Sequence, residues 1–380
     1  MMRVYLFFII VNVLFQACSS NKTYIEGQKE VLEVPAEPSE EGFFGNHFEL
    51  AEAIRIETHE DFLVSDIKRL IRYQDKVILL SGQNNTIFII NAKGGRIEQT
   101  IHRIGSGPGE YRTVLDIAFD EKSKQIAVYN DYGKVLLFNL AGDFISDLDV
   151  DGTFEGLSCY DGKLIFFNKL EGYAYKPEFV RIFDLDDKSW EEIGDVEKTI
   201  EFPIRSYGRP IVKSARLWLA APLNFILSSY DGNKLEPVYE LAIPNSNISE
   251  ILRELSVSDP RKFFGEVSKN KLIYGIHSIR ETEDYMVFRS NQEGIFILDK
   301  NTNRVYWDKY VEEKAIAMKL TEYYPHDGDD AKIMFIVSAD YYTENIQKNA
   351  ENGKTVGKVN NDDNPILLFY KQKLKNTHVQ

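Results

Sequence analysis

The sequence has few cysteines and histidines, and it is short of positive charge. Two cysteines and six scattered histidines are present in 380 residues. The 45 lysines and arginines stand against 59 aspartates and glutamates, which gives a net charge of −14. Such a chain repels a phosphate backbone and lacks the counterion release that drives nucleic-acid binding. We therefore expect no nucleic-acid partner.

The composition does not indicate a disordered chain. Hydrophobic residues make up 43% of the sequence, enough to bury a substantial core. Aromatic residues make up 13%, with 21 tyrosines and 24 phenylalanines. Such residues fill the pleated surfaces of strands, so the composition favours a folded, strand-rich protein.

A long apolar run occurs at the start of the chain. Arg3 is followed by apolar residues from Val4 to Phe15, and Ala17 directly precedes Cys18. The run is too short to span a bilayer stably, so residues 1–17 are predicted to be a secretory signal peptide.

The end of this signal resembles a bacterial lipobox, in which the cysteine is diacylated and becomes the mature N-terminus. Phe15 and Gln16 depart from the usual leucine and small residue. The resemblance implies lipid attachment, by palmitate-type chains, at Cys18. Ser19 stands where an aspartate would retain the protein at the inner membrane, so the outer membrane is implied, on its periplasmic or its surface side. The alternative is an ordinary cleaved signal with a chance cysteine.

Residues 18–50 are rich in serine, glutamate, proline and glycine without an apolar period, and we interpret them as a flexible tether. If Cys18 carries lipid, Cys159 has no partner for an intramolecular disulfide. Cys159 lies in the apolar stretch GLSCYDGKLIFF, with no histidine near it in sequence. We predict a buried core thiol there, not a nucleophile.

The body of the chain repeats. TIFIINAKGGRI, from Thr86, aligns with KVLLFNLAGDFI, from Lys134, at an offset of 48. Similar apolar runs followed by polar turns are anchored near Asn91, Asn139, Asp184, Ser229, Asp299 and Tyr370. Spacings of about 40 to 50 residues with several short strands each are typical of β-propeller blades. The sequence predicts an all-β, six-bladed β-propeller over residues 51–375.

Two long intervals between anchors predict insertions. Residues 246–268 show helical spacing, with Asn247 and Asp259 placed to cap two short helices and Pro260 opening the second. Residues 339–364 are polar and predict a long loop. The last blade lacks an outermost strand, and the alternating segment from Ala51 to Glu60 is predicted to supply it and close the ring.

The glycine-rich stretch HRIGSGPGEY, residues 102–111, could be a phosphate loop or a turn. A phosphate loop needs a helix directly after it, but alternating strand patterns follow Tyr111. Gly105, Gly107 and Gly109 are therefore predicted to allow positive φ and close backbone approach between two blades.

GSGPGEY and the closing DDNPILLFYKQKL resemble segments of the bacterial six-bladed β-propeller lipoproteins that are related to NHL-repeat propellers. The family's GPGE(Y/F) segment maps to residues 107–111, and its Asn-Pro maps to Asn364 and Pro365. The resemblance covers residues 50–375. It supports the propeller fold and implies no catalytic residue.

Two acidic clusters were weighed as metal sites. Asp147, Asp149 and Asp151 match the start of a calcium loop, but Ser158 stands where the bidentate glutamate belongs. We favour carboxylates on an outer strand. HDGDDAK, from His326, lacks ligand spacing, and turn chemistry explains it. We expect no metal, no cofactor and no catalytic residue.

One basic segment, FPIRSYGRPIVKSARLW, stands out in an acidic chain. Its arginines either pair with carboxylates of neighbouring strands or hold an anionic or uronate-containing ligand with guanidinium forks. The candidate ligand-binding residues are Arg205, Tyr207, Arg209, Arg216, Glu110 and Tyr111.

Two function classes follow. A binding or protein-interaction scaffold, for a carbohydrate or an envelope protein, needs only a funnel and exposed loops. A propeller enzyme, a lyase or hydrolase, needs a metal or histidine and aspartate groups converging on the channel. No motif for the second was found, so the first is favoured.

Overall fold

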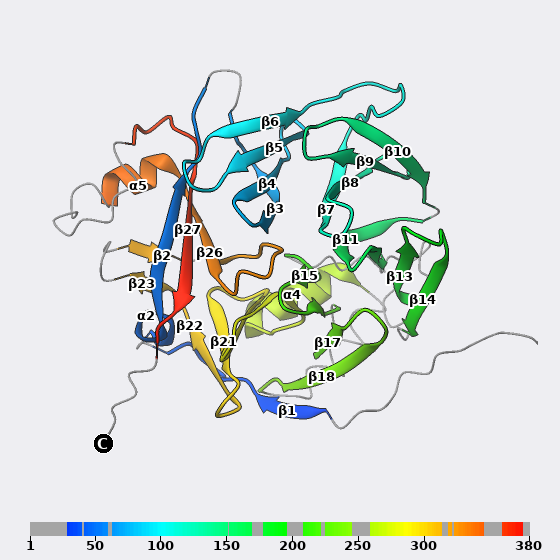
Figure 1. Cartoon of the computed structure of the whole chain (residues 1–380). Coiled ribbons are helices and arrows are strands. Elements are labelled where there is room, and N and C mark those ends of the chain that lie inside the picture. Colours follow the sequence, from blue (N-terminus) through cyan, green and yellow to red (C-terminus); the bar gives the residue numbers. More distant parts are fainter. Residues whose placement is uncertain are drawn as a thin grey trace, which may run out of the picture.

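The computed structural model describes residues 29–39, 42–59, 63–150, 152–168, 178–195, 208–221, 225–244, 259–313, 318–320, 323–345 and 359–374. Six small sheets stand in a ring around a central axis (Figure 1). The chain is therefore an all-β, six-bladed β-propeller, as predicted.

The first three blades follow one another along the chain. Blade 1 contains β3 (Ile67–Tyr73), β4 (Lys76–Ser81), β5 (Thr86–Asn91) and β6 (Ile97–Ile101). Blade 2 contains β7 (Val114–Asp120), β8 (Gln125–Asn130), β9 (Lys134–Asn139) and β10 (Phe144–Asp149). Blade 3 contains β11 (Phe154–Tyr160), β12 (Lys163–Asn168), β13 (Glu178–Asp184) and β14 (Trp190–Asp195).

Two of the remaining blades, blades 4 and 6, each include a strand from the N-terminal part of the chain. Blade 4 contains β15 (Ile211–Lys213), β16 (Leu217–Leu219), β17 (Ile226–Tyr230), β18 (Leu235–Ala242) and the added β1 (Glu30–Glu33). Blade 5 contains β19 (Ile276–Glu281), β20 (Tyr285–Ser290), β21 (Ile295–Asp299) and β22 (Arg304–Asp308). Blade 6 contains β25 (Tyr323–Tyr324), β26 (Ile333–Val337), β27 (Ile366–Gln372) and β2 (Phe48–Arg55). A separate ladder pairs β23 (Val311–Glu313) with β24 (Met318–Leu320).

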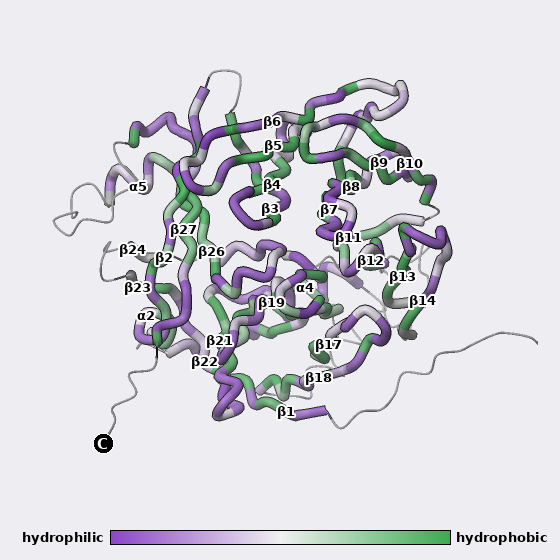
Figure 2. The backbone as a smooth tube through the Cα atoms, in the orientation of Figure 1, coloured by the Kyte–Doolittle hydropathy of each residue, from purple (hydrophilic) through white to green (hydrophobic). Residues whose placement is uncertain are grey.

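Each of the six sequence anchors falls on the third strand of its blade: β5, β9, β13, β17, β21 and β27. These strands carry apolar side chains on both faces because each blade is sandwiched between two others. The buried apolar residues accordingly form six clusters, one at each junction of neighbouring blades. In Figure 2 the strands within the blades are largely hydrophobic, whereas segments around the centre of the ring are hydrophilic.

The ring is closed by the N-terminal strand, as predicted. β2 pairs antiparallel with β27 and begins at Phe48, a few residues before the predicted Ala51. In Figure 1 the two strands, blue and red, lie side by side. Asn364 strengthens this closure: its side-chain oxygen accepts from Val64 N at 2.8 Å, and its amide donates to Glu57 O at 2.7 Å.

Part of the predicted tether belongs to the fold. We define the N-terminal strap as residues 29–39 and 42–47. Its strand β1 runs parallel to β18 at the edge of blade 4, and Ser39 N donates to Trp307 O on blade 5 at 2.7 Å. Helix α2 (Phe43–His47) then begins against Asp308, whose carboxylate accepts from Phe43 N and Phe44 N at 2.9 and 2.7 Å. The strap therefore covers successive edges of blades 4 and 5 before β2 joins blade 6.

The two insertions are partly as predicted. Helix α4 (Pro260–Asn270) begins where the second capped helix was expected, and Asp259 accepts from Arg261 N and Lys262 N. The first helix of residues 246–268 lies outside the described residues. The predicted polar loop of residues 339–364 instead opens with helix α5 (Ala339–Asn345), because Ala339 and Tyr342 are buried in the junction of blades 5 and 6. Among the described residues, no helix has both the length and the apolar character needed to cross a bilayer.

Candidate functional site

The axis of the propeller is surrounded by its inner strands, and four of these strands are irregular near their start. β3, β7, β11 and β19 each carry a register shift after the first or second residue. A bulge re-aims the side chains that follow it. Arg69 and Asp116 directly follow such shifts, and both are buried. The bulges in the inner strands therefore direct the side chains of Arg69 and Asp116 toward the axis.

The first group of charges joins blades 1, 2 and 4. Arg209, just before β15, donates to Asp116 from both terminal guanidinium nitrogens, Nη1 to Oδ1 at 3.0 Å and Nη2 to Oδ2 at 2.7 Å. Leu157 N on blade 3 donates to the same carboxylate at 2.7 Å. Arg69 Nε lies 4.0 Å from Asp116 Oδ1, and Arg69 Nη2 donates to Leu157 O at 3.0 Å. Four blades meet at this point.

The second group is brought in by the hairpin before β26, residues 325–332, which reaches toward the centre of the ring (Figure 1). Asp327 is buried there. Its backbone exchanges hydrogen bonds with Leu70 O and Arg72 N on blade 1, at 3.0 and 2.7 Å. Its carboxylate accepts from Ser158 Oγ and Lys213 N, both at 3.0 Å, and also pairs with Arg69. We call residues 325–332 the channel hairpin.

The third group surrounds Arg280 of β19, which is fully buried. Its Nη1 donates to the carbonyls of Lys213, His326 and Gly328 at 2.9, 3.1 and 2.6 Å. Its Nη2 donates to Asp330, which also accepts from His326 Nε2 at 2.9 Å. Arg280 thus fastens the channel hairpin to blades 4 and 5.

The three acidic side chains on the axis, Asp116, Asp327 and Asp330, are matched by three arginines: Arg69, Arg209 and Arg280. Burial raises the pKa of Asp116 to about 6, against the opposing effect of Arg69 and of two backbone amides. Burial and Arg280 lower the pKa of His326, so its ring is neutral at neutral pH. Burial opposes ionisation of Asp330, yet His326 and Arg280 hold its pKa well below the usual range. The network therefore joins the inner strands to the channel hairpin through paired charges.

This network corrects the interpretation of HDGDDAK as ordinary turn chemistry. The segment forms the channel hairpin, and a carboxylate and histidine cluster does lie on the axis. A signal was available in the sequence: Arg69 and Asp116 interrupt strands whose other residues are mostly apolar. A charge inside such a run needs a buried partner, and here the partner comes from a distant part of the chain.

The basic segment is divided by the structure. Arg205 and Tyr207 lie outside the described residues. Arg209 precedes β15 and Arg216 follows it, at opposite ends of that inner strand. The Arg209 side chain is 14% exposed and committed to Asp116. Arg216 is 45% exposed, lies 3.5 Å from Glu281, and sits over the Trp218 ring. Where described, these arginines are paired with carboxylates of neighbouring blades.

The glycine-rich stretch is a turn between the outer strand β6 and the inner strand β7, as expected. Gly109 has φ +73°, and a Cβ there would lie 2.6 Å from the Phe144 ring. Gly105 and Gly107 do not adopt positive φ, so that expectation was wrong for them. They instead lie close to the Glu110 carboxylate, which accepts from Gly107 N at 2.8 Å.

Glu110 and Tyr111 were candidate ligand contacts, and the structure gives both a structural role. Tyr111 is fully buried, and its hydroxyl donates to Ile101 O at 3.0 Å and Asn85 O at 3.1 Å. Its ring therefore has no face open to a ligand. The Glu110 carboxylate stabilises the loop by accepting the hydrogen bond from Gly107 N.

The other candidates are placed as follows. Cys18 lies outside the described residues. Cys159 is buried as predicted, and burial, helped by Asp120, raises the pKa of its thiol. Asp147 and Asp149 lie on the outermost strand of blade 2, where Lys134 Nζ contacts them at 2.6 and 3.3 Å. Within the described part of the chain, no group of three histidine, cysteine, aspartate or glutamate side chains could hold a metal ion.

Comparison with known proteins supports the fold. A family model described as a domain of unknown function (DUF4934) matches residues 44–371. The chain is similar in structure to a candidate exported protein of Bacteroides fragilis, with a TM-score of 0.71, 17% identity, and coverage of 90% of this chain and 99% of that one. It is also similar to a DUF4221 family member from Bacteroides vulgatus, with a TM-score of 0.52, 14% identity, and coverage of 87% and 100%. No curated protein matches the sequence significantly.

Proposed function

The chain belongs to the DUF4934 family, a domain of unknown function, and from this premise we propose that it is an exported β-propeller, anchored by lipid at Cys18, that acts as a binding scaffold at the outer membrane. Its proposed partners are a carbohydrate, especially an anionic one, or another protein of the cell envelope. A relationship to NHL-repeat propellers is part of the same proposal.

The pairing of the charged groups around the axis supports the scaffold proposal. Asp116, Asp327 and Asp330 are each held by an arginine of another strand, and the channel hairpin is bonded to blades 1, 3, 4 and 5. A general acid or base must be free to meet a substrate. Groups committed to one another in this way fasten the blades together. We therefore expect recognition at the outer faces and edges of the blades.

Export and anchoring are supported by the leader of the sequence. The apolar run from Val4 to Phe15 ends at Ala17 and Cys18 in the manner of a lipobox. The description of the Bacteroides fragilis structure as a candidate exported protein agrees with export, the coarser part of this proposal. A diacylated cysteine adds two acyl chains, which is enough for stable membrane attachment.

One observation favours an enzyme as the second candidate. Asp116 sits on the axis with its pKa raised to about 6 by burial, in the range useful for proton transfer. A lyase or hydrolase of this kind would lose turnover in Asp116→Asn. The enzyme function would be favoured over the scaffold function if the wild type degraded an acidic polysaccharide and a folded Asp116→Asn variant did not.

The scaffold proposal is tested with the full-length protein in detergent. Neutral and acidic oligosaccharides are titrated, and envelope proteins are cross-linked to the protein in cells and identified. We expect binding of acidic oligosaccharides that weakens with salt, because it depends on cationic side chains. If no saccharide binds and no envelope protein is cross-linked above the level of a membrane-bound control protein, the scaffold proposal is wrong.

The arginine site deduced from the basic segment is a narrower form of this proposal. Arg216 is half exposed and available to a ligand, whereas Arg209 would have to release Asp116. Loss of acidic-ligand binding in Arg205→Ala and Arg216→Ala, with an unchanged melting temperature, would support it.

A further inference from the structure

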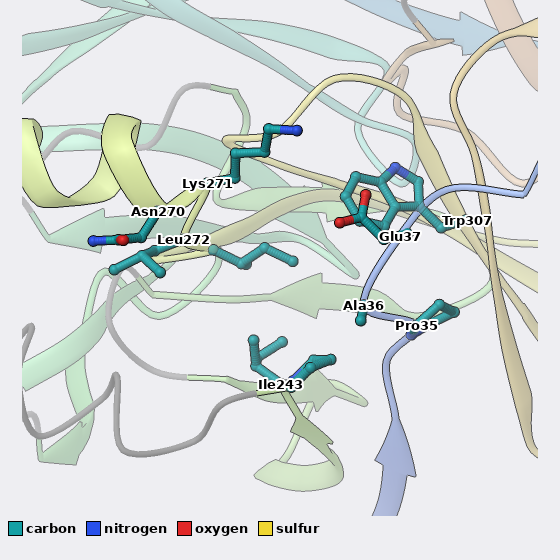
Figure 3. Close-up of a pocket in the computed structure, with 10 residues that line it drawn as sticks. Pro35, Ala36, Glu37, Ile243, Asn270, Lys271, Leu272 and Trp307 are labelled. Carbon is teal, nitrogen blue, oxygen red and sulfur yellow. The ribbon is translucent and has the colours of Figure 1, made fainter.

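A pocket lies at the junction of blades 4 and 5, beside the helical insertion (Figure 3). Its volume is about 160 Å³. An engineered cavity of about 150 Å³ takes up benzene, so this pocket has room for one six-membered ring. Its walls come from the strap, the end of β18, the end of α4 and β22.

The floor of the pocket is apolar and fixed in place. Trp307 is nearly buried, its indole Nε1 donates to Glu293 O at 2.9 Å, and it stacks on Phe296 at a centroid distance of 4.9 Å. Leu272 and Ile243 complete the floor, and both are buried. A rigid aromatic and aliphatic surface suits the apolar face of a sugar ring, because little conformational entropy is lost on contact.

The strap forms the opposite wall through Pro35, Ala36 and Glu37. This wall is held on both sides: Val34 N donates to Ala242 O at 3.1 Å, and Ser39 N donates to Trp307 O at 2.7 Å. The pocket is therefore a built feature of the fold, and the wall belongs to the segment that follows the proposed lipid anchor.

Two charged side chains stand at the rim without a partner among the described residues. Lys271 ends α4 in the left-handed conformation, with φ 50° and ψ 43°. In Figure 3 its side chain extends toward the side of the pocket where Glu37 and Trp307 lie. Among the described residues, no ion pair joins Lys271 to Glu37 or to another side chain. The carbonyls at the end of α4 accept from Lys271 N and Leu272 N, so they do not compete for the ammonium group.

We propose that this pocket binds the terminal acidic sugar, of uronate type, of a carbohydrate. The ring lies on Trp307 and Leu272, the carboxylate pairs with Lys271, and Glu37 accepts hydrogen bonds from ring hydroxyls. The proposal rests on the proposed function in carbohydrate binding, and it moves the site from the basic segment to the neighbouring junction of blades.

Titration of the full-length protein in detergent with glucuronate and galacturonate, and with glucose and galactose as neutral controls, tests the pocket. Ala36→Phe fills the pocket from an exposed strap position, while Ala36→Ser leaves it open. Lys271→Asn removes the charge with a residue that tolerates the left-handed conformation. Its matched control is Lys124→Asn, at a left-handed lysine of a blade 2 turn.

We expect uronate affinity to fall about tenfold or more in Lys271→Asn, as for the loss of one charge-assisted hydrogen bond. Ala36→Phe should reduce it at least as much, because the ring occupies the space of the ligand. Ala36→Ser and Lys124→Asn should match the wild type. Neutral sugars should bind to the wild type more weakly than uronates do. Their affinity for Lys271→Asn should equal their affinity for the wild type. Uronate binding that survives Ala36→Phe overturns the pocket while leaving carbohydrate binding in place. Absence of uronate binding by the wild type also overturns it, whereas the scaffold function is judged separately by the cross-linking experiment.

Discussion

Removing the Arg209 side chain is the most direct test of whether the axial charges are structural. In the wild type, Arg209 supplies two of the four hydrogen bonds to Asp116, and the others come from Leu157 N and Ile117 N. Arg209→Ala leaves a buried carboxylate with two amides and with Arg69 at 4.0 Å. The substitution therefore changes a neutral group of charges into one with an excess buried negative charge.

The expected loss of stability follows from this geometry. Breaking a buried ion pair by removing one partner costs about 3–5 kcal/mol, and the remaining donors favour the lower end, about 3 kcal/mol. For a propeller of roughly 330 residues, the unfolding entropy of about 2.1 cal/mol/K per residue converts this into a fall in Tm of about 4 °C. Asp116→Asn in the same chain should restore about 1–2 kcal/mol, because the amide carries no charge to leave unpaired.

Thermal and urea melts of the two single variants and the double variant measure this coupling. Arg216→Ala is the matched control, since its side chain is 45% exposed and 3.5 Å from Glu281, and exposed pairs contribute less than about 1 kcal/mol. A Tm unchanged within 1 °C in Arg209→Ala, or no coupling with Asp116, would refute the structural interpretation. If acidic-ligand binding were lost at the same time, Arg209 would be a ligand contact.

Three further outcomes are expected. Gly109→Val should cost about 1–3 kcal/mol, from its positive φ and the nearby Phe144 ring, and more than Gly107→Val in the same melts. Burial, with help from Arg289, lowers the pKa of His277 from 6.5 to about 3, so the unfolded chain binds the proton first. Stability should then be full above pH 6.5 and fall as the pH drops toward 3, and His277→Gln should flatten that part of the profile; an unchanged profile contradicts the assignment. Cys18→Ala should move the protein from the membrane pellet to the soluble fraction, and continued sedimentation with membranes would contradict lipid anchoring.

The blade count and the order of strands could be predicted because they depend on local pattern. A buried apolar run followed by a polar turn marks the third strand of every blade, and the spacing of these runs fixes the number of blades. The cap at Asp259 and the closing strand at β2 likewise follow from neighbouring residues. The glycine-rich stretch shows the limit of such reasoning. Positive φ was expected for three glycines, but only Gly109 has it, while Gly105 and Gly107 do not.

The channel network could not be predicted in the same way, because its partners meet only when the ring is complete. Arg69 and Asp327 are 258 residues apart, and Arg209 and Asp116 are 93 apart. The strap has the same property: Glu30 pairs with Tyr239 on blade 4, so a four-residue strand in a polar segment depends on a distant edge. In both cases the charged residues or the short strand segment can be read from the sequence, but their partners are brought close only by the complete fold.

Blade 6 closes the structure twice, and this bears on where a ligand can bind. At the rim, β27 receives β2 and Asn364 ties down Val64. At the axis, the channel hairpin of the same blade is fastened by Arg69 and Arg280. The polar groups in these contacts are engaged in holding blade 6 to its neighbours, and a propeller ring needs such contacts to leave no free edge. The pocket between blades 4 and 5 differs, because one of its walls is Pro35, Ala36 and Glu37 of the strap, which lie outside the strands of the blades. Its charged rim residues are not needed to hold the ring together, so their chemistry is available for recognition.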